Sequence, residues 1–212
     1  MPGITKTFSR WKLNSWQTIL LFGFLLCAIH AFGAFTFDQF AGAATAGFGI
    51  MGEAGGVGMF YIYVMAYFLV LVVVLPVLRI RRFGVGVAVY LPYAIIGLFV
   101  EYYFEWFVNP VLVSPWAVVG WCAFGLATGL SADLSYRFLP LRFSERLRSI
   151  TTGLVVGSVT FVLTLVALTF FYVEPQSGPG SFLGIAYYAL PFLLISSGFG
   201  GYTAYAVSQE TK

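Results

Sequence analysis

Long apolar runs, separated by short polar or basic segments, dominate this chain. The runs are continuous and lack the two-residue alternation of transmembrane β-strands. Each is close to the roughly 20 residues that an α-helix needs to cross the hydrocarbon core of a bilayer. The pattern predicts six membrane-spanning helices, at residues 16–37, 59–78, 83–104, 115–134, 147–173 and 181–207.

The composition strengthens this prediction. Hydrophobic residues make up 60% of the 212 residues and charged residues 9%, with a mean hydropathy of +0.91. A soluble domain carries about a quarter charged residues. We therefore expect an all-α integral membrane protein, with an N-terminal segment (1–15), a six-helix domain (16–207) and a short tail (208–212). The first run is interpreted as a helix rather than a cleavable signal, because no small-residue cleavage site follows a short apolar core.

The basic residues fall on one side of the predicted topology. With six spans, all 11 Lys and Arg lie in the N-terminal segment, the second and fourth connections and the tail. The other side carries acids only: Asp38, Glu53, Glu101, Glu105 and Glu174. The positive-inside rule then predicts a multi-pass protein of the plasma membrane with both termini cytoplasmic. Because the basic residues flank the spans, the net charge of +3 does not indicate a nucleic-acid partner.

The outer connection at residues 38–58 is rich in glycine and alanine and contains Glu53. Irregular backbone at membrane depth persists only where protein or water satisfies its polar groups. Three interpretations stay open: a lid over a site, a re-entrant loop, or a plain solvated loop. In the first, Glu53 would fold onto a bound cation; in the last, it would be solvated.

The stretch V-E-Y-Y-F-E-W-F-V-N-P, residues 100–110, places two acids among aromatic side chains. On a helix, Glu101, Glu105 and Asn109 share one stripe, and Tyr102 and Trp106 form the next. Such a cluster would suit a cationic aromatic ligand, through cation–π contacts and carboxylate pairing. The alternative is an interfacial aromatic belt whose acids extend to water.

Little in the sequence suggests catalysis or metal binding. His30 is the only histidine, which excludes bis-histidine haem ligation and argues against a His-rich copper or zinc site. Cys27 and Cys122 lie in apolar runs without metal-type spacing. Walker, G-x-S-x-G and H-E-x-x-H motifs are absent from the sequence. We expect no cofactor and no enzymatic activity in this chain.

Small residues recur at helical spacing in three of the predicted spans. Such residues permit close helix contact, either within the chain or with a partner subunit. They are Cys27, Ala28 and Ala31 in the first span, Gly125, Gly129 and Ala132 in the fourth, and Gly153 and Gly157 in the fifth.

Four stretches carry a family resemblance: A-G-F-G-I-M-G-E-A-G-G-V-G-M-F (46–60), R-R-F-G (81–84), V-E-Y-Y-F-E-W (100–106) and G-L-A-T-G-L-S-A-D-L-S-Y (125–136). With the six-helix layout, they resemble the substrate-binding S component of energy-coupling factor (ECF) vitamin transporters, of the type for thiamine or its hydroxymethylpyrimidine precursor. The resemblance implies an outward-opening pocket for a small cationic aromatic ligand. The ligand-binding residues would be Glu53, Glu101, Tyr102, Glu105, Trp106 and Asn109.

The resemblance also implies partner subunits. An S component docks through small residues of its first helix onto a membrane subunit that carries two cytoplasmic ATPases. The family's A-x-x-x-A repeat is replaced here by Cys27-x-x-x-Ala31, with Ala28 beside it. Docking would therefore involve Cys27, Ala28 and Ala31.

A second interpretation is a non-catalytic accessory or structural subunit of a membrane oxidoreductase complex. Residues 101–110 are similar to stretches in membrane subunits of copper-dependent ammonia and methane monooxygenases, but the expected histidine ligands are absent. A third interpretation is a structural membrane protein without a ligand.

Overall fold

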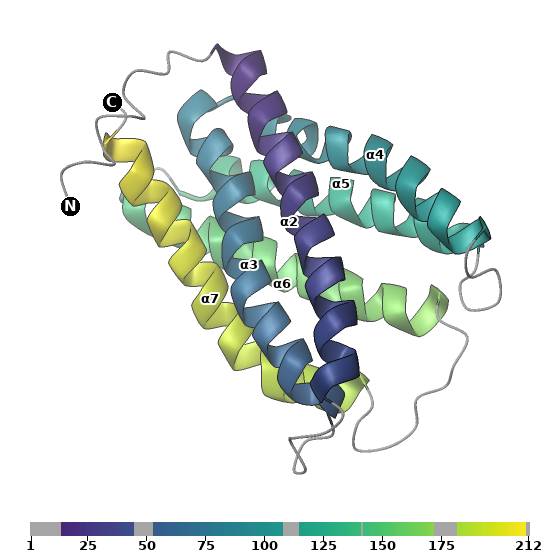
Figure 1. Ribbon diagram of the computed structural model, residues 1–212. Helices are drawn as coiled ribbons and strands as arrows, with labels where there is room; N and C mark the ends of the chain where they lie inside the picture. Colours follow the sequence, from purple (N-terminus) through teal and green to yellow (C-terminus); the bar gives the residue numbers. More distant parts are fainter. Residues whose placement is uncertain (1–13, 45–52, 108–114, 141, 172–181, 211–212) are drawn as a thin grey trace.

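The computed structural model describes the backbone of residues 14–44, 53–107, 115–140, 142–171 and 182–210. It describes the surroundings of the side chains for a smaller set: residues 14–29, 64–96, 119–120, 122–140, 142–163, 166 and 190–210. The described residues are helical, with short connections and no strand. The helices are α2 (Ser15–Ala44), α3 (Glu53–Ile80), α4 (Val85–Phe107), α5 (Pro115–Phe138), α6 (Glu145–Phe171) and α7 (Phe182–Glu210) (Figure 1). The all-helical prediction is thus confirmed for this part of the chain.

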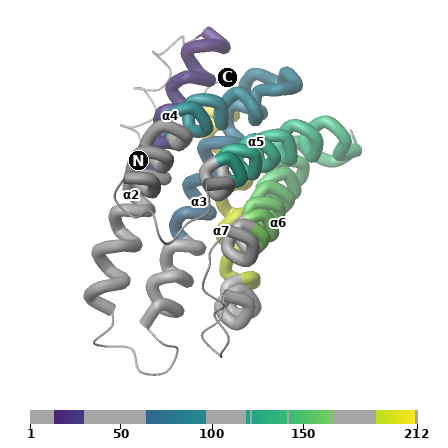
Figure 2. Tube along the Cα trace, turned by 90° about the vertical axis from the view of Figure 1, so that its right-hand side faces the viewer, coloured from purple at the N-terminus to yellow at the C-terminus, as the bar shows by residue number. Residues whose placement is uncertain are grey.

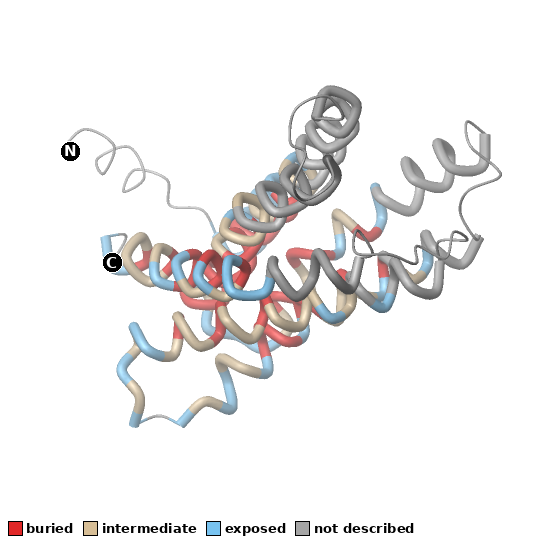
Figure 3. The backbone as a smooth tube through the Cα atoms, turned by 90° about the horizontal axis from the view of Figure 1, so that it is seen from below, coloured by how far each residue is buried: buried red, intermediate tan, exposed pale blue. Residues whose placement is uncertain are grey.

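The central helix of the bundle is α3, which contacts α2, α4, α5, α6 and α7. Contacts between α2 and α4, α4 and α5, α5 and α6, and α6 and α7 arrange the other helices around it. The second half of α3 is apolar on every side, and Val70, Val73 and Val74 have no exposed surface. A helix that is apolar all round belongs in the interior. Figure 3 shows the buried residues gathered where the helices converge, and Figure 2 shows α5 and α6 side by side.

A tight turn joins α3 to α4. Arg81 has a φ of 57° and Gly84 a φ of 89°, so both occupy the left-handed region. Such a residue just beyond a helix end is a common way of terminating the helix. The Nε–H of Arg81 also donates to the carbonyl oxygen of Leu78 at 3.4 Å, which satisfies one of the last carbonyls of α3. Nothing lies within 4 Å of a Cβ built on Gly84, so its φ rather than space favours glycine there.

Two helix starts carry side-chain caps. The backbone N–H of Leu147 donates to Ser144 Oγ at 3.2 Å, so Ser144 is the N-cap of α6. At the start of α2, Asn14 and Gln17 cap each other: Gln17 N–H donates to Asn14 Oδ1 at 2.9 Å, and Asn14 N–H donates to Gln17 Oε1 at 3.0 Å. This reciprocal arrangement is a capping box, and it fixes where α2 begins.

The connection expected at residues 38–58 is shorter than predicted. Helix α2 continues to Ala44 and α3 begins at Glu53, so only residues 45–52 remain between them, and these lie outside the described residues. The prediction treated small side chains as a sign of irregular backbone, yet alanine is the strongest helix former. The choice between lid, re-entrant loop and plain loop falls on residues 45–52 and stays open.

Two described helical segments are long and apolar enough to cross a membrane, Glu145–Leu163 and Leu190–Glu210. Shorter apolar helical stretches cover Ser15–Ile29, Val64–Ile80 and Val85–Ile96. The start of α2 and the end of α7 lie at the same end of the bundle (Figure 1). The turn between α3 and α4 and the connection between α5 and α6 lie at that end as well, since Arg81 pairs with Glu145, which also contacts Gln209.

Candidate functional site

The predicted ligand-binding residues lie at helix ends. Because α4 extends to Phe107, the acid–aromatic stretch occupies its last turns, and Glu53 is the first residue of α3. The backbone is therefore helical at Glu101, Tyr102, Glu105 and Trp106, as the two predicted stripes require. The side chains of five of the residues, and Asn109 as a whole, lie outside the described part of the chain: Glu53, Glu101, Tyr102, Glu105 and Trp106. The pocket they would form stays a prediction.

The predicted docking residues on α2 differ in exposure. Ala28 is exposed and Cys27 half-buried, whereas the side chain of Ala31 is outside the described residues. Gly23, on the side of α2 away from Ala28, packs so closely on α4 that an added Cβ would lie 2.6 Å from Cγ of Pro92. Ala28 thus lies on the outward face of α2, where a partner would have access, and docking stays a prediction.

The α4–α5 contact depends on a pair of glycines. A Cβ on Gly86 would lie 2.3 Å from the carbonyl oxygen of Gly129, and a Cβ on Gly129 would lie 2.4 Å from that of Gly86. The carboxylate of Asp133, one turn beyond Gly129, accepts hydrogen bonds from the backbone N–H groups of Gly86 at 3.0 Å and Val87 at 3.2 Å. Only 2% of Asp133 is exposed. A buried carboxylate at a helix start satisfies orphan N–H groups and the positive end of the helix dipole, so Asp133 holds α4 against α5.

The small residues of α6 likewise serve internal packing. A Cβ on Gly153 would lie 2.5 Å from the carbonyl oxygen of Ser197, and one on Gly201 would lie 2.5 Å from that of Ser149. The hydroxyl of Ser149 donates to the carbonyl oxygen of Gly201 at 2.7 Å. For Gly125, Gly129, Gly153 and Gly157, contacts within the chain therefore account for the spacing seen in the sequence.

Every charged side chain that the structure describes lies at the end of the bundle where α3 meets α4. Among them, one carboxylate pairs with one guanidinium: Glu145 with Arg81. Four further arginines lie over aromatic rings, a contact typical of partly exposed guanidinium groups. They are Arg148 over Tyr136 at 4.5 Å, Arg146 over Tyr202 at 4.9 Å, Arg137 over Phe83 at 5.7 Å and Arg142 over its neighbour Phe143 at 6.0 Å from the ring centroid. The sequence predicted that these arginines lie on the same side of the six-helix topology, but it did not predict their aromatic partners.

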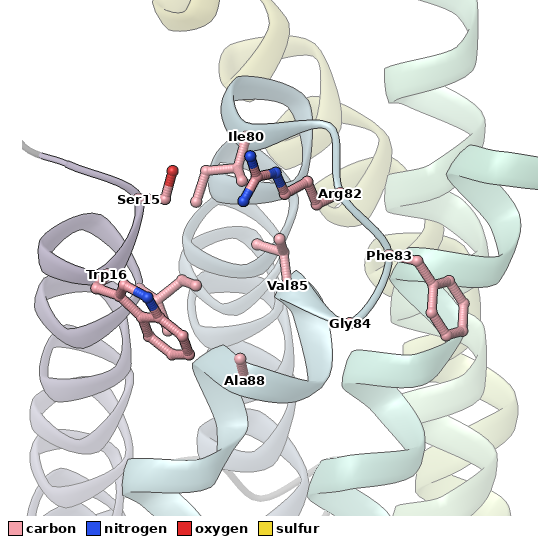
Figure 4. Close-up of a pocket in the computed structure, with 9 residues that line it drawn as sticks. Ser15, Trp16, Ile80, Arg82, Phe83, Gly84, Val85 and Ala88 are labelled. Carbon is pink, nitrogen blue, oxygen red and sulfur yellow. The ribbon is translucent and has the colours of Figure 1, made fainter.

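A pocket of about 190 Å³ lies at the same end, between the start of α2 and the α3–α4 turn. Figure 4 shows the guanidinium of Arg82 reaching across it toward Ser15, with the indole of Trp16 on the α2 side and Phe83 pointing away. The apolar part of its wall consists of Ile19, Ile80, Val85 and Ala88. No local sequence pattern indicates this pocket, because its two sides are separated by more than 60 residues along the chain.

Metal sites such as those for zinc are built from His, Cys, Asp and Glu side chains that lie close together. No three His, Cys, Asp or Glu residues lie together among the described side chains. The two cysteines are free thiols, and Sγ of Cys122 donates to the carbonyl oxygen of Ala94 at 3.3 Å. No family model, no curated protein and no solved structure matches the chain. Function is therefore inferred from the residues and their geometry.

Proposed function

We propose that the chain is a multi-pass membrane protein with six spanning helices. The observation that carries this proposal is the large, apolar outer surface of the bundle. Soluble monomers rarely expose contiguous apolar patches beyond a few hundred Å². Here large apolar side chains point outward from several helices: Trp16, Leu20 and Phe24 of α2, Leu91 and Ile95 of α4, Val162 of α6, and Ile195 and Phe199 of α7.

The interior supports the same proposal. Buried hydroxyls cluster between the helices, and the residues are Thr18, Thr128, Ser131, Ser149, Thr152, Ser196 and Ser197. Several bond to backbone carbonyls of their own helix, as Thr128 does to Phe124 at 2.9 Å and Ser131 to Thr128 at 2.7 Å. Small residues and hydroxyls at close helix contacts, with large apolar residues outside, are typical of membrane bundles. The helices contain 23 to 30 residues, which at about 1.5 Å per residue exceeds the ~30 Å hydrocarbon core.

Orientation follows from the arginine-rich end, which the positive-inside rule assigns to the cytoplasm. The test uses single cysteines in a background with Cys27→Ala and Cys122→Ala. In intact cells, a membrane-impermeant maleimide should label Ser177→Cys, in the last predicted outer connection, and should label Arg142→Cys only after lysis. Labelling of Arg142→Cys in intact cells would show that the orientation is the opposite one. Recovery of the chain in the soluble fraction would show that it is not inserted in the membrane.

Within this topology, we propose that the chain is the substrate-binding subunit of a vitamin or vitamin-precursor uptake transporter, similar to an ECF S component. The end of α4 and the start of α3 point away from the arginine-rich end, because α3 and α4 meet there. The acid–aromatic stretch and Glu53 would thus be at the outer surface, where a cationic aromatic ligand arrives. Energy for transport would come from partner subunits with cytoplasmic ATPases.

Ligand binding is tested by thermal stability of the detergent-purified chain with thiamine, hydroxymethylpyrimidine, other vitamins and simple aromatic cations. A ligand at a hundred times its Kd stabilises the fold by about 2.7 kcal/mol. Glu101→Gln and Trp106→Ala should weaken that stabilisation, whereas Glu210→Gln, at the opposite end, should leave it unchanged. No response to any compound, from folded protein, would favour the accessory-subunit interpretation instead.

A further inference from the structure

The pocket between α2 and the α3–α4 turn has a polar rim and an apolar wall. The rim carries the guanidinium of Arg82 and the hydroxyl of Ser15, and Ile19, Ile80 and Val85 line the wall (Figure 4). Trp16, which is 72% exposed, stands beside it. Tryptophan is enriched at the level of the lipid headgroups, where its ring meets both water and hydrocarbon. We propose that this pocket binds the phosphate headgroup of an anionic phospholipid of the cytoplasmic leaflet.

The proposal rests on charge complementarity at this end of the bundle. Among the described residues, Arg82 has no ion-pair partner. Two acids at this end of the bundle have other partners: Asp133 accepts the N–H groups of Gly86 and Val87 inside the bundle, and Glu145 pairs with Arg81. The segment directly before α2, residues 1–13, contains three basic residues and no acid. An external anion is therefore the natural partner of Arg82.

The size of the pocket favours a headgroup over a metabolite. Pockets for drug-sized ligands have volumes of roughly 300–1,000 Å³, whereas this one has about 190 Å³. A phosphodiester with the first carbons of its glycerol is a better match. Basic pockets between spanning helices on the cytoplasmic side are a recurrent form of anionic-lipid site.

Exposed apolar rows begin at the pocket and offer a path for the acyl chains. On α2, Trp16, Leu20 and Phe24 follow one another at a spacing of four residues and are all exposed. On α4, Ala88 lines the pocket, and Leu91 and Ile95 continue outward on the same side of the helix. A phosphate held by Arg82 would place its lipid tails beside these rows. The inference rests on the membrane insertion proposed above but not on the identity of the outer ligand.

The experiment measures lipid binding to the full chain by native mass spectrometry in a neutral detergent. Phosphatidylglycerol and phosphatidylcholine with identical acyl chains are titrated, with inorganic phosphate as a separate arm. We expect phosphatidylglycerol to bind more tightly, and Arg82→Gln to weaken it at least about fivefold, since one basic residue near the surface contributes ~1 kcal/mol. Arg82→Lys should retain most of the affinity.

Two further variants distinguish binding in the pocket from nonspecific attraction of the lipid to surface charge. Arg142→Gln removes an exposed arginine that does not line the pocket, so it should leave the affinity unchanged. Ala88→Phe keeps every charge but fills the pocket, so it should weaken binding as Arg82→Gln does. Unchanged melting temperatures without lipid would show that both variants fold.

Three results would overturn the proposal. They are equal affinity for the two lipids, an equal loss of phosphatidylglycerol affinity in Arg82→Gln and Arg142→Gln, and inorganic phosphate binding as tightly as the lipid. The last would assign the pocket to a free anion. If the chain is recovered from membranes yet shows no lipid preference, the lipid site fails while membrane insertion stands.

Discussion

Replacing Gly129 with alanine tests how closely α4 and α5 must approach. The added Cβ would lie 2.4 Å from the carbonyl oxygen of Gly86, 2.7 Å from its carbonyl carbon and 2.9 Å from the backbone nitrogen of Val87. All three atoms are backbone, so no side chain can rotate away. The two helices must separate by several tenths of an ångström. That separation also lengthens the hydrogen bonds from the N–H groups of Gly86 and Val87 to Asp133, now 3.0 and 3.2 Å.

The expected destabilisation can be assembled from these contacts. Overpacking costs about 1–3 kcal/mol, and weakening hydrogen bonds to a charged group costs up to about 1.5–3 kcal/mol. Alanine in place of glycine within a helix returns about 1 kcal/mol. The free energy of unfolding should therefore fall by up to roughly 5 kcal/mol, with a middle value of about 2.5 kcal/mol. For a chain of this length, the middle value lowers Tm by on the order of 10 °C.

Gly198→Ala is the matched control. Its added Cβ would lie 3.5 Å from Cδ2 of Leu154 and 3.9 Å from Cγ of Leu154, which is ordinary van der Waals contact. Its stability should equal or slightly exceed that of the wild type. Both variants are followed by circular dichroism during heating in the same mild detergent. Equal melting temperatures for Gly129→Ala and Gly198→Ala would show that the glycine contact does not hold the two helices together.

Three further predictions concern the arginine-rich end, and thermal melts in detergent measure each of them. Asp133→Ala leaves two N–H groups at the start of α4 without an acceptor, so stability should fall by about 1–3 kcal/mol; an unchanged Tm would contradict that role. Ser144→Ala removes the cap on the N–H of Leu147 and should cost about 1 kcal/mol, whereas Ser144→Asp should keep the wild-type Tm. Glu145→Gln breaks an exposed ion pair and should cost less than about 1 kcal/mol, so a larger loss would contradict the small contribution expected of an exposed pair.

Local patterns in the sequence determined much of the helical architecture. The apolar runs predicted six helices, and six are present in the described part of the chain. The N-cap at Ser144 and the tight turn before Val85 are equally local features, because caps and turns depend on neighbours a few positions away. The same locality led to one error, since the glycine- and alanine-rich residues 38–58 were expected to form a loop, whereas residues 38–44 and 53–58 are helical.

Only the tertiary structure decided which residues meet across the bundle. The sequence showed small residues at Gly129 and Gly153 but not that backbone carbonyls of Gly86 and Ser197 fill the space beside them. Nor did it show that the carboxylate of Asp133 closes the start of α4, 47 residues earlier in the chain. Such contacts depend on how helices pack, and helical periodicity contains no information about which helix lies opposite. For the same reason, the arginines predicted which end of the bundle faces the cytoplasm but not the pocket at Arg82. That pocket exists because α2 packs beside the α3–α4 turn.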